Sequence, residues 1–139
     1  MLPSTRVRPG VHQLALLLLL LHPGGCTDAG APRPGGRFRF TESSHAEAVR
    51  LEATSTEALA QADSLLRSGA ARWVAGTPRR GDGGFNAPWR WHLDPATIAF
   101  AEVTIEACQT WPSAVEQDLD YWIGFGQVCL WGTVEAREP

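Results

Sequence analysis

The sequence predicts an α+β domain, in which one mainly antiparallel sheet of about five or six strands is covered by two helices and one disulfide is formed. Three observations support this fold class. Segments in which apolar and polar residues alternate outnumber the segments with helical periodicity. The helical segments are too few to separate the strands of a parallel, doubly wound sheet. Two cysteines, Cys108 and Cys129, remain when the one near the N-terminus is set aside.

Alternation defines the strands. Phe38 and Phe40 alternate with arginines, and the same pattern or a short apolar run predicts further strands at residues 49–53, 70–76, 89–94, 98–108 and 127–134. In the segment 98–108, one face would carry Ala101, Val103, Ile105 and Ala107, and the other Glu102, Thr104 and Glu106. In the segment 89–94, one face would carry Trp89, Trp91 and Leu93, and the other Arg90, His92 and Asp94.

The clearer of the two helices covers residues 54–69. Thr54 and Glu57 have the spacing of a capping box, and Gly69 is the expected left-handed end. One face of this helix is apolar at helical spacing, with Ala58, Leu59, Ala62, Leu65 and Leu66.

The second helix is predicted to begin at a capping box formed by Ser113 and Glu116 and to end near Gly124 and Gly126. Its inward residues would be Val115, Leu119 and Trp122.

The N-terminal segment has the pattern of a secretion signal. Arg6 and Arg8 precede an apolar run, 14–21, that is too short to span a bilayer, and small residues follow it. We therefore expect a signal peptide at 1–25, a flexible tether rich in Gly, Pro and Ala at 26–36, and a single domain at 37–135. Gly25-Cys26 is similar to the end of a bacterial lipobox, so Cys26 is a candidate lipidation site, with ordinary cleavage nearby as the alternative.

Export in turn favours a disulfide between Cys108 and Cys129, which would close a loop of about 20 residues and stabilise the fold by roughly 3 kcal/mol. A zinc site would need about four ligands, and two cysteines with distant histidines supply a poor set.

The charge balance argues against nucleic acid as a partner. All twelve basic residues are arginines, and two of them lie in the signal, which leaves ten against fifteen acids and no basic tract.

His92 and Asp94 are the candidate catalytic residues, because a strand would direct both toward the same space. No nucleophile motif accompanies them, and a His fixed by Asp94, with Asp94 capping the turn at Pro95, is the structural alternative. A small hydrolase-like enzyme is therefore one of two alternatives to a binding domain.

Tryptophan is abundant, with six in the chain. Trp111 and Trp131 are the best candidates for an exposed binding surface, although packing in the core is the simpler expectation for tryptophan in a small domain.

Residues 83–131 carry a resemblance to a known family. The run GGFNAPWRWHLDPATIAFAEVTIEAC, then PSAVEQDLDYW and CLW, resembles a domain family of exported bacterial proteins. That family is related to the N-terminal domain of a slime-mould vesicular protein associated with calmodulin and calcium regulation. The chain departs from the family pattern at Gln109, where Asp is usual, and at Leu130, where Pro is usual. The resemblance implies a small exported α+β domain and supplies no reaction.

The family's association makes calcium the one candidate cofactor. Asp82, Glu102 and Glu106 are the candidate ligands, since calcium prefers oxygen donors, but no EF-hand loop is present. Solvated acids on an open sheet face are the alternative reading of these residues, and a calcium-regulated module is the second alternative function.

The leading expectation is a non-enzymatic domain of the cell envelope, held at the membrane only through a lipid on Cys26, or secreted. Its partner would be an unidentified protein or extracellular ligand.

Overall fold

The computed structural model describes residues 35–139. The predicted signal peptide, the lipidation site Cys26 and all but the last residues of the predicted tether lie outside the described residues. Among the helices of the described part, none is long and apolar enough to cross a membrane. The elements follow one another as β1 (Gly36–Glu42), β2 (Glu47–Ala53), α1 (Thr56–Ser68), β3 (Arg72–Gly76), β4 (Pro78–Arg80), β5 (Trp91–Leu93), η1 (Pro95–Thr97), β6 (Ala99–Ala101), η2 (Glu106–Cys108), α2 (Pro112–Gln117), α3 (Leu119–Phe125) and β7 (Val128–Glu138).

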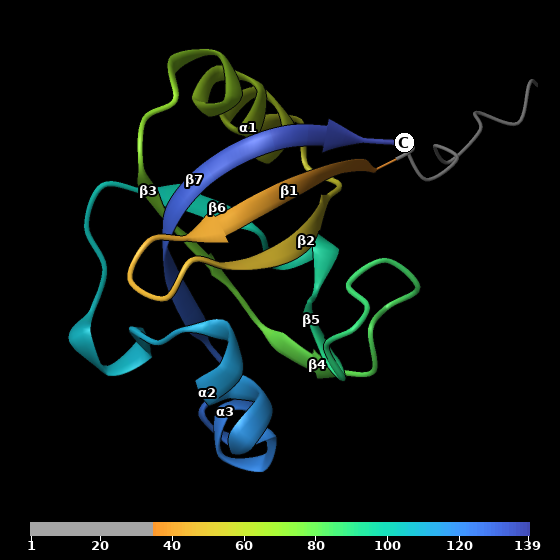
Figure 1. The fold of residues 1–139 in the computed structure, drawn as a ribbon, viewed down its shortest axis with the longest axis vertical. Helices are drawn as coiled ribbons and strands as arrows, with labels where there is room; N and C mark the ends of the chain where they lie inside the picture. The colour runs from red at the N-terminus through yellow and green to blue at the C-terminus, as the bar shows by residue number, and fades with distance from the viewer. Residues whose placement is uncertain (1–34) are drawn as a thin grey trace, which may run out of the picture. The chain divides into compact units, whose positions relative to one another are not determined.

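A five-stranded antiparallel sheet in the order β2-β1-β7-β3-β6 forms the body of the domain, and β4 and β5 form a separate two-stranded sheet. The predicted α+β class with a mainly antiparallel sheet and one disulfide is confirmed. The last strand, β7, lies in the centre of the sheet and runs to Glu138, further than the predicted end at Val134. Figure 1 shows α1 at one end of the curved sheet and α2 and α3 at the other.

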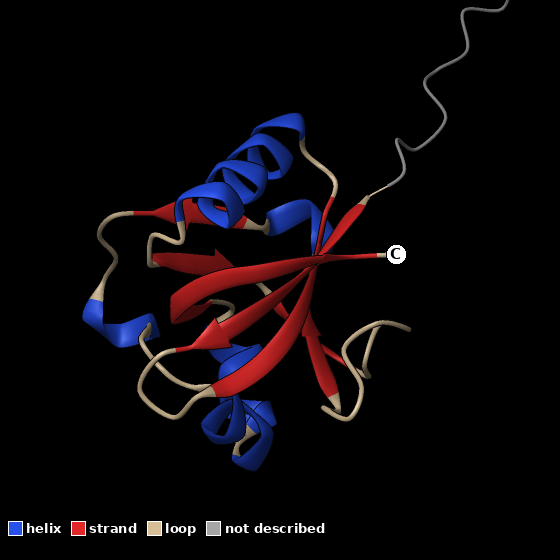
Figure 2. Cartoon of the chain, turned by 45° about the horizontal axis from the view of Figure 1, so that its top comes forward, coloured by secondary structure: helices blue, strands red, loops and turns tan. Residues whose placement is uncertain are grey.

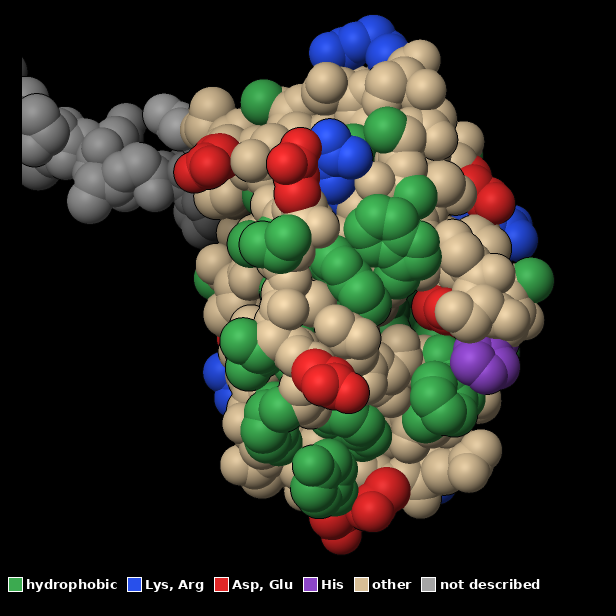
Figure 3. Space-filling model, turned by 90° about the vertical axis from the view of Figure 1, so that its left-hand side faces the viewer, with side chains coloured by type: hydrophobic (Ala, Val, Ile, Leu, Met, Phe, Trp, Pro, Cys, Tyr) green, Lys and Arg blue, Asp and Glu red, His purple; other side chains and the backbone are tan. Residues whose placement is uncertain are grey.

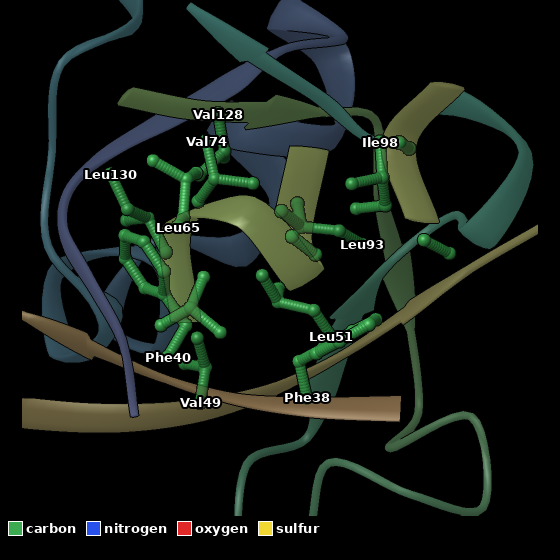
Figure 4. Packing of buried hydrophobic residues seen from close by; sticks show 14 of the residues in the cluster. Phe38, Phe40, Val49, Leu51, Leu65, Val74, Leu93, Ile98, Val128 and Leu130 are labelled. Carbon is green, nitrogen blue, oxygen red and sulfur yellow. The ribbon is translucent and has the colours of Figure 1, made fainter. Parts of the chain in front are cut away.

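The core lies on the inner face of this sheet. Phe38, Phe40, Leu51, Val74 and Leu130 each have 1% or less of their surface exposed. Figure 4 shows these strand residues converging on Leu65 of α1 and Leu93 of β5. The apolar stripe of α1 packs as predicted, with Ala58, Ala62 and Leu65 buried.

Helix α1 begins one residue later than the predicted capping box. Ser55 is the N-cap, and its hydroxyl accepts a hydrogen bond from the backbone N–H of Ala58 at 3.0 Å. The Thr54 hydroxyl instead donates to the carbonyl of Pro95, so Thr54 links the end of β2 to η1. The predicted end at Gly69 is confirmed, with a left-handed φ of 65°.

The predicted strand at 98–108 is wrong beyond Ala101. Register pairs Trp73 of β3 with Ala101 of β6, and β3 begins at Arg72, so the chain after Glu102 has no strand to pair with. Val103 and Ile105 are consequently exposed, at 81% and 59%, instead of facing inward. The segment then turns into η2, where Cys108 reaches Cys129 of β7.

The predicted second helix is two helices, α2 and α3, separated at Asp118. Asp118 leaves the helical conformation and accepts the backbone N–H of Tyr121, which starts α3. The predicted Ser113/Glu116 capping box is also wrong. Trp111 is the N-cap of α2 and makes no side-chain cap, while the Glu116 carboxylate accepts hydrogen bonds from Arg90.

The loop between β4 and β5 projects from the body of the domain, as Figure 2 shows. Asn86 anchors its end: the buried side-chain oxygen accepts the backbone N–H of Arg50 at 2.7 Å, and the side-chain nitrogen donates to the carbonyl of Trp91 at 2.8 Å. Because both halves of this amide are used, Asn86 ties the loop to β2 and to β5 together.

Candidate functional site

Two tryptophans lie side by side on the outer face of the sheet. Register places Trp73 of β3 directly opposite Trp131 of β7, and their ring centroids lie 5.3 Å apart with a tilt of 56°. The residues that follow or precede them, Val74 and Leu130, point inward and are fully buried, whereas both indoles are half-buried. Alternation along the two strands therefore directs this aromatic pair away from the core.

The turn between β1 and β2 brings a second aromatic pair to the same face. His45 of this turn stacks on Trp111, which precedes α2, with centroids 4.4 Å apart and planes inclined by 18°. The turn is fixed to β7, since the backbone N–H of Ser43 donates to the carbonyl of Trp131 at 2.9 Å.

Glu42, at the end of β1, holds this turn. Its carboxylate accepts the backbone N–H groups of Ser44 at 2.7 Å and His45 at 2.9 Å, and His45 Nδ1 lies 3.2 Å away. Burial alone would raise the pKa of Glu42, but the hydrogen bonds from the backbone of Ser44 and His45 outweigh burial and hold the pKa below its ordinary value. Glu42 is therefore a buried structural carboxylate whose acceptor oxygens are already engaged.

The disulfide brings the opposite wall into place. Cys108 and Cys129 are bonded with their Cα atoms 5.1 Å apart. Gln109 forms an isolated parallel bridge with Cys129, and the backbone N–H of Thr110 donates to the Cys129 carbonyl at 3.1 Å. These contacts align the segment from Glu106 to Trp111 alongside β7.

Together these residues enclose an open hollow of about 420 Å³, here called the aromatic hollow, lined by Glu42, Ser44, His45, Trp73, Glu106, Gln109, Thr110, Trp111 and Trp131. Figure 3 shows hydrophobic side chains gathered on this face of the molecule, the left-hand side of Figure 1. The two predicted surface tryptophans thus lie in one hollow. Trp111 is 39% exposed, and Trp131 is half-buried against Trp73.

The predicted catalytic residues are held by other contacts. His92 Nδ1 lies 2.7 Å from the carbonyl of Gly81, to which it donates, and the His92 ring packs edge-on against Phe85. Asp94 accepts the backbone N–H of Ala96 at 3.1 Å and pairs with Arg79. The hydrogen bond from Ala96 and the Arg79 guanidinium hold the pKa of Asp94 below its ordinary value, which makes Asp94 a weak base. The arrangement fixes the β4–β5 hairpin and the turn at Pro95.

The predicted calcium ligands are not brought together. Asp82 accepts the backbone N–H of Gly84 within the β4–β5 loop, Glu102 pairs with Arg72, and Glu106 borders the aromatic hollow. Within residues 35–139, no group of three or more His, Cys, Asp or Glu side chains is arranged to hold a metal ion.

The sequence reasoning missed the remaining lining of the hollow, above all Trp73, His45 and Glu42. A usable signal exists for Trp73: it precedes Val74 as Trp131 follows Leu130, so both alternate with residues expected in the core. No local pattern predicts that His45 and Trp111, which are far apart in the sequence, stack on each other.

Comparison with curated proteins and with solved structures finds no match. Comparison with protein families finds one, the BP-74 N-terminal domain, whose model covers residues 36–138. The match runs from the first residue of β1 to the last residue of β7 and so includes every element that forms the aromatic hollow. The chain belongs to the BP-74 N-terminal domain family.

Proposed function

We propose that this protein is an exported bacterial binding domain without enzymatic activity, held in the cell envelope through a lipid on Cys26 or secreted. Its ligand, a protein or another extracellular molecule, binds at the aromatic hollow. One observation carries the proposal: three indoles from separate parts of the chain, Trp73, Trp111 and Trp131, open into one hollow and not into the core.

The energetics of tryptophan support a binding role. A large ring left partly in water forgoes the stabilisation that burial would give, about 25 cal/mol for each Å² of apolar surface. Side chains of this type dominate the binding energy where they fill pockets of a partner. A domain of this size has room in its core for Trp91, which is fully buried, so exposure of three other indoles on one face favours a ligand there.

The contacts of the candidate catalytic residues support the non-enzymatic part of the proposal. His92 Nδ1 and Asp94 are engaged in bonds that fix the hairpin, and the lowered pKa of Asp94 is the wrong direction for a general base. The hydrolase and calcium alternatives stay predictions that no contact among the described residues favours.

Export rests on the sequence alone. The apolar run preceded by arginines, the Gly25-Cys26 pair and the even number of downstream cysteines all favour it. Mass spectrometry of the N-terminus of the mature protein tests it: we expect a chain beginning at a diacylated Cys26. Processing near Cys26 without lipid would leave a secreted domain, and a full-length N-terminus would contradict export.

Capture from cell-envelope extract tests the binding role. The full chain is compared with Trp111→Leu and with the matched control Phe125→Leu, because Phe125 has the same exposure as Trp111, 40% against 39%, and lies outside the hollow. We expect a partner that the wild type and Phe125→Leu retain and Trp111→Leu loses. Equal retention by all three variants would exclude the hollow as the binding surface.

A further inference from the structure

We propose that the ligand of the aromatic hollow is a small soluble quaternary ammonium compound, whose cationic head lies against the indoles and faces Glu106. This inference rests on the proposed function, because it names the ligand class of the same hollow.

The first argument is the ring type. The face of an indole carries the strongest negative potential among the aromatic side chains, and a cation within about 6 Å of the ring centre is attracted to it. The hollow presents Trp73 and Trp131 as a tilted pair, and Trp111 on the adjacent wall. Several indoles around one space are the arrangement by which proteins enclose quaternary ammonium groups.

The second argument is charge. The lining includes two carboxylates and no arginine, although arginine is the abundant cation of this chain. Among the acidic residues of the described part, all but Glu106 have a hydrogen bond or an ion pair within the protein, as Glu102 has with Arg72 and Glu116 with Arg90. Glu106 is exposed at the rim of the hollow with its charge unpaired, so the hollow is complementary to a cation.

The third argument concerns the kind of cation. A primary ammonium donates three hydrogen bonds and needs acceptors, but the Glu42 carboxylate is already occupied by Ser44 and His45. A quaternary ammonium donates none, so one free carboxylate and aromatic faces satisfy it. A volume of about 420 Å³ also suits a small molecule.

The test is a titration of the full chain with choline, followed by calorimetry and by tryptophan fluorescence. The neutral analogue 3,3-dimethyl-1-butanol has the same shape without the charge. We expect saturable binding of choline at millimolar concentration and binding of the neutral analogue weakened about tenfold or more. Equal binding of the two compounds, or no saturable binding of choline, overturns the inference.

Two variants locate the cation. Glu106→Gln should weaken choline binding about threefold to tenfold, while Glu57→Gln, which removes an exposed carboxylate on α1, should not change it. Trp111→Leu keeps an apolar side chain but removes the ring, and it should weaken binding by a similar factor, with Phe125→Leu as the unchanged control. Unaltered affinity in both hollow variants would place choline elsewhere and overturn the inference.

Two further arms separate this inference from the proposed function. Binding to phosphatidylcholine vesicles without binding to free choline would assign the ligand to a membrane and contradict a soluble ligand. Failure of choline, together with a partner captured by the wild type and lost by Trp111→Leu, would remove the ammonium ligand and leave the hollow as the binding surface.

Discussion

The two faces of the β3–β7 ladder differ in what their side chains do. On the inner face, Val74 and Leu130 form a cross-strand pair with no exposed surface. On the outer face, one residue away on each strand, Trp73 and Trp131 form a cross-strand pair of larger side chains that stay half-buried. The more hydrophobic surface area is thus placed on the side that faces water.

This difference separates stability from binding within two short strands. The inner pair packs against α1 and β5, so its removal would leave a cavity. The outer pair packs chiefly on itself, with the turn after β1 and the segment before α2 beside it. Substitutions on the two faces should consequently have separable effects, and the predictions below test this separation.

The largest effect is expected on the inner face. Leu130→Ala should lower the free energy of unfolding by about 3 to 4 kcal/mol, because the void it leaves is enclosed on all sides. Trp131→Leu should cost only about 1 kcal/mol, since it loses mainly the contact with Trp73. Urea denaturation of the two variants measures both, and equal losses would break the distinction between the faces.

The disulfide comes next, since it joins the wall of the hollow to β7. Replacing Cys108 and Cys129 together by serine should lower the free energy of unfolding by about 3 kcal/mol, the value expected for a loop of 21 residues. The loss of order should fall first on the segment 102–111. Hydrogen exchange would show this as faster exchange of the Thr110 amide, which donates to Cys129, before that of the Leu130 amide. Simultaneous exchange would mean that the wall and the sheet open as one unit.

The sequence was sufficient where local pattern decides the structure. The α1 stripe, its end at Gly69, the Phe38/Phe40 alternation and the disulfide all follow from spacing. It was insufficient at 102–108, where the apolar alternation of Val103 and Ile105 is that of a strand but no partner strand extends that far. The cap of α1 moved by one residue because Thr54 finds a better acceptor in Pro95, a contact from another part of the chain.

The site was predicted only in part for the same reason. Trp111 and Trp131 could be singled out as surface candidates, but the hollow also needs His45, which reaches Trp111 through the fold of the β1–β2 turn. His92 and Asp94 do share a strand face as predicted. Their actual partners, Gly81 and Ala96 with Arg79, come from turn geometry that residue spacing does not reveal.

Glu42 sharpens the comparison at the point where the inner row of β1 meets the hollow. Glu42→Gln should cost about 1 to 2 kcal/mol, because an amide cannot accept all the bonds that the carboxylate accepts. Since the pKa of Glu42 is lower in the folded state, its contribution is complete above the ordinary glutamate pKa of about 4.3 and is lost as pH falls through the folded value. Thermal melts from neutral to acid pH should therefore bring the wild type and the variant closer together. A constant difference would contradict this assignment.

The smallest effect on stability is expected at Trp111. Trp111→Leu should change the free energy of unfolding by no more than about 0.5 kcal/mol, because the ring is exposed and its main partner is His45. Together with the expected loss of ligand, this would make Trp111 a residue used for binding alone. A destabilisation comparable to that of Leu130→Ala would instead make Trp111 a part of the core.

Strand β1 also determines which way the hollow faces when the domain is attached to something. The chain enters β1 at Gly36, next to the point where β7 ends, since Arg37 pairs with Glu138. Glu42, at the other end of the same strand, borders the hollow. Six residue steps of strand separate the two by about 20 Å. A support, fusion partner or membrane joined ahead of Gly36 would therefore meet the domain at its rear, and the indoles would be presented outward, open to any molecule diffusing past.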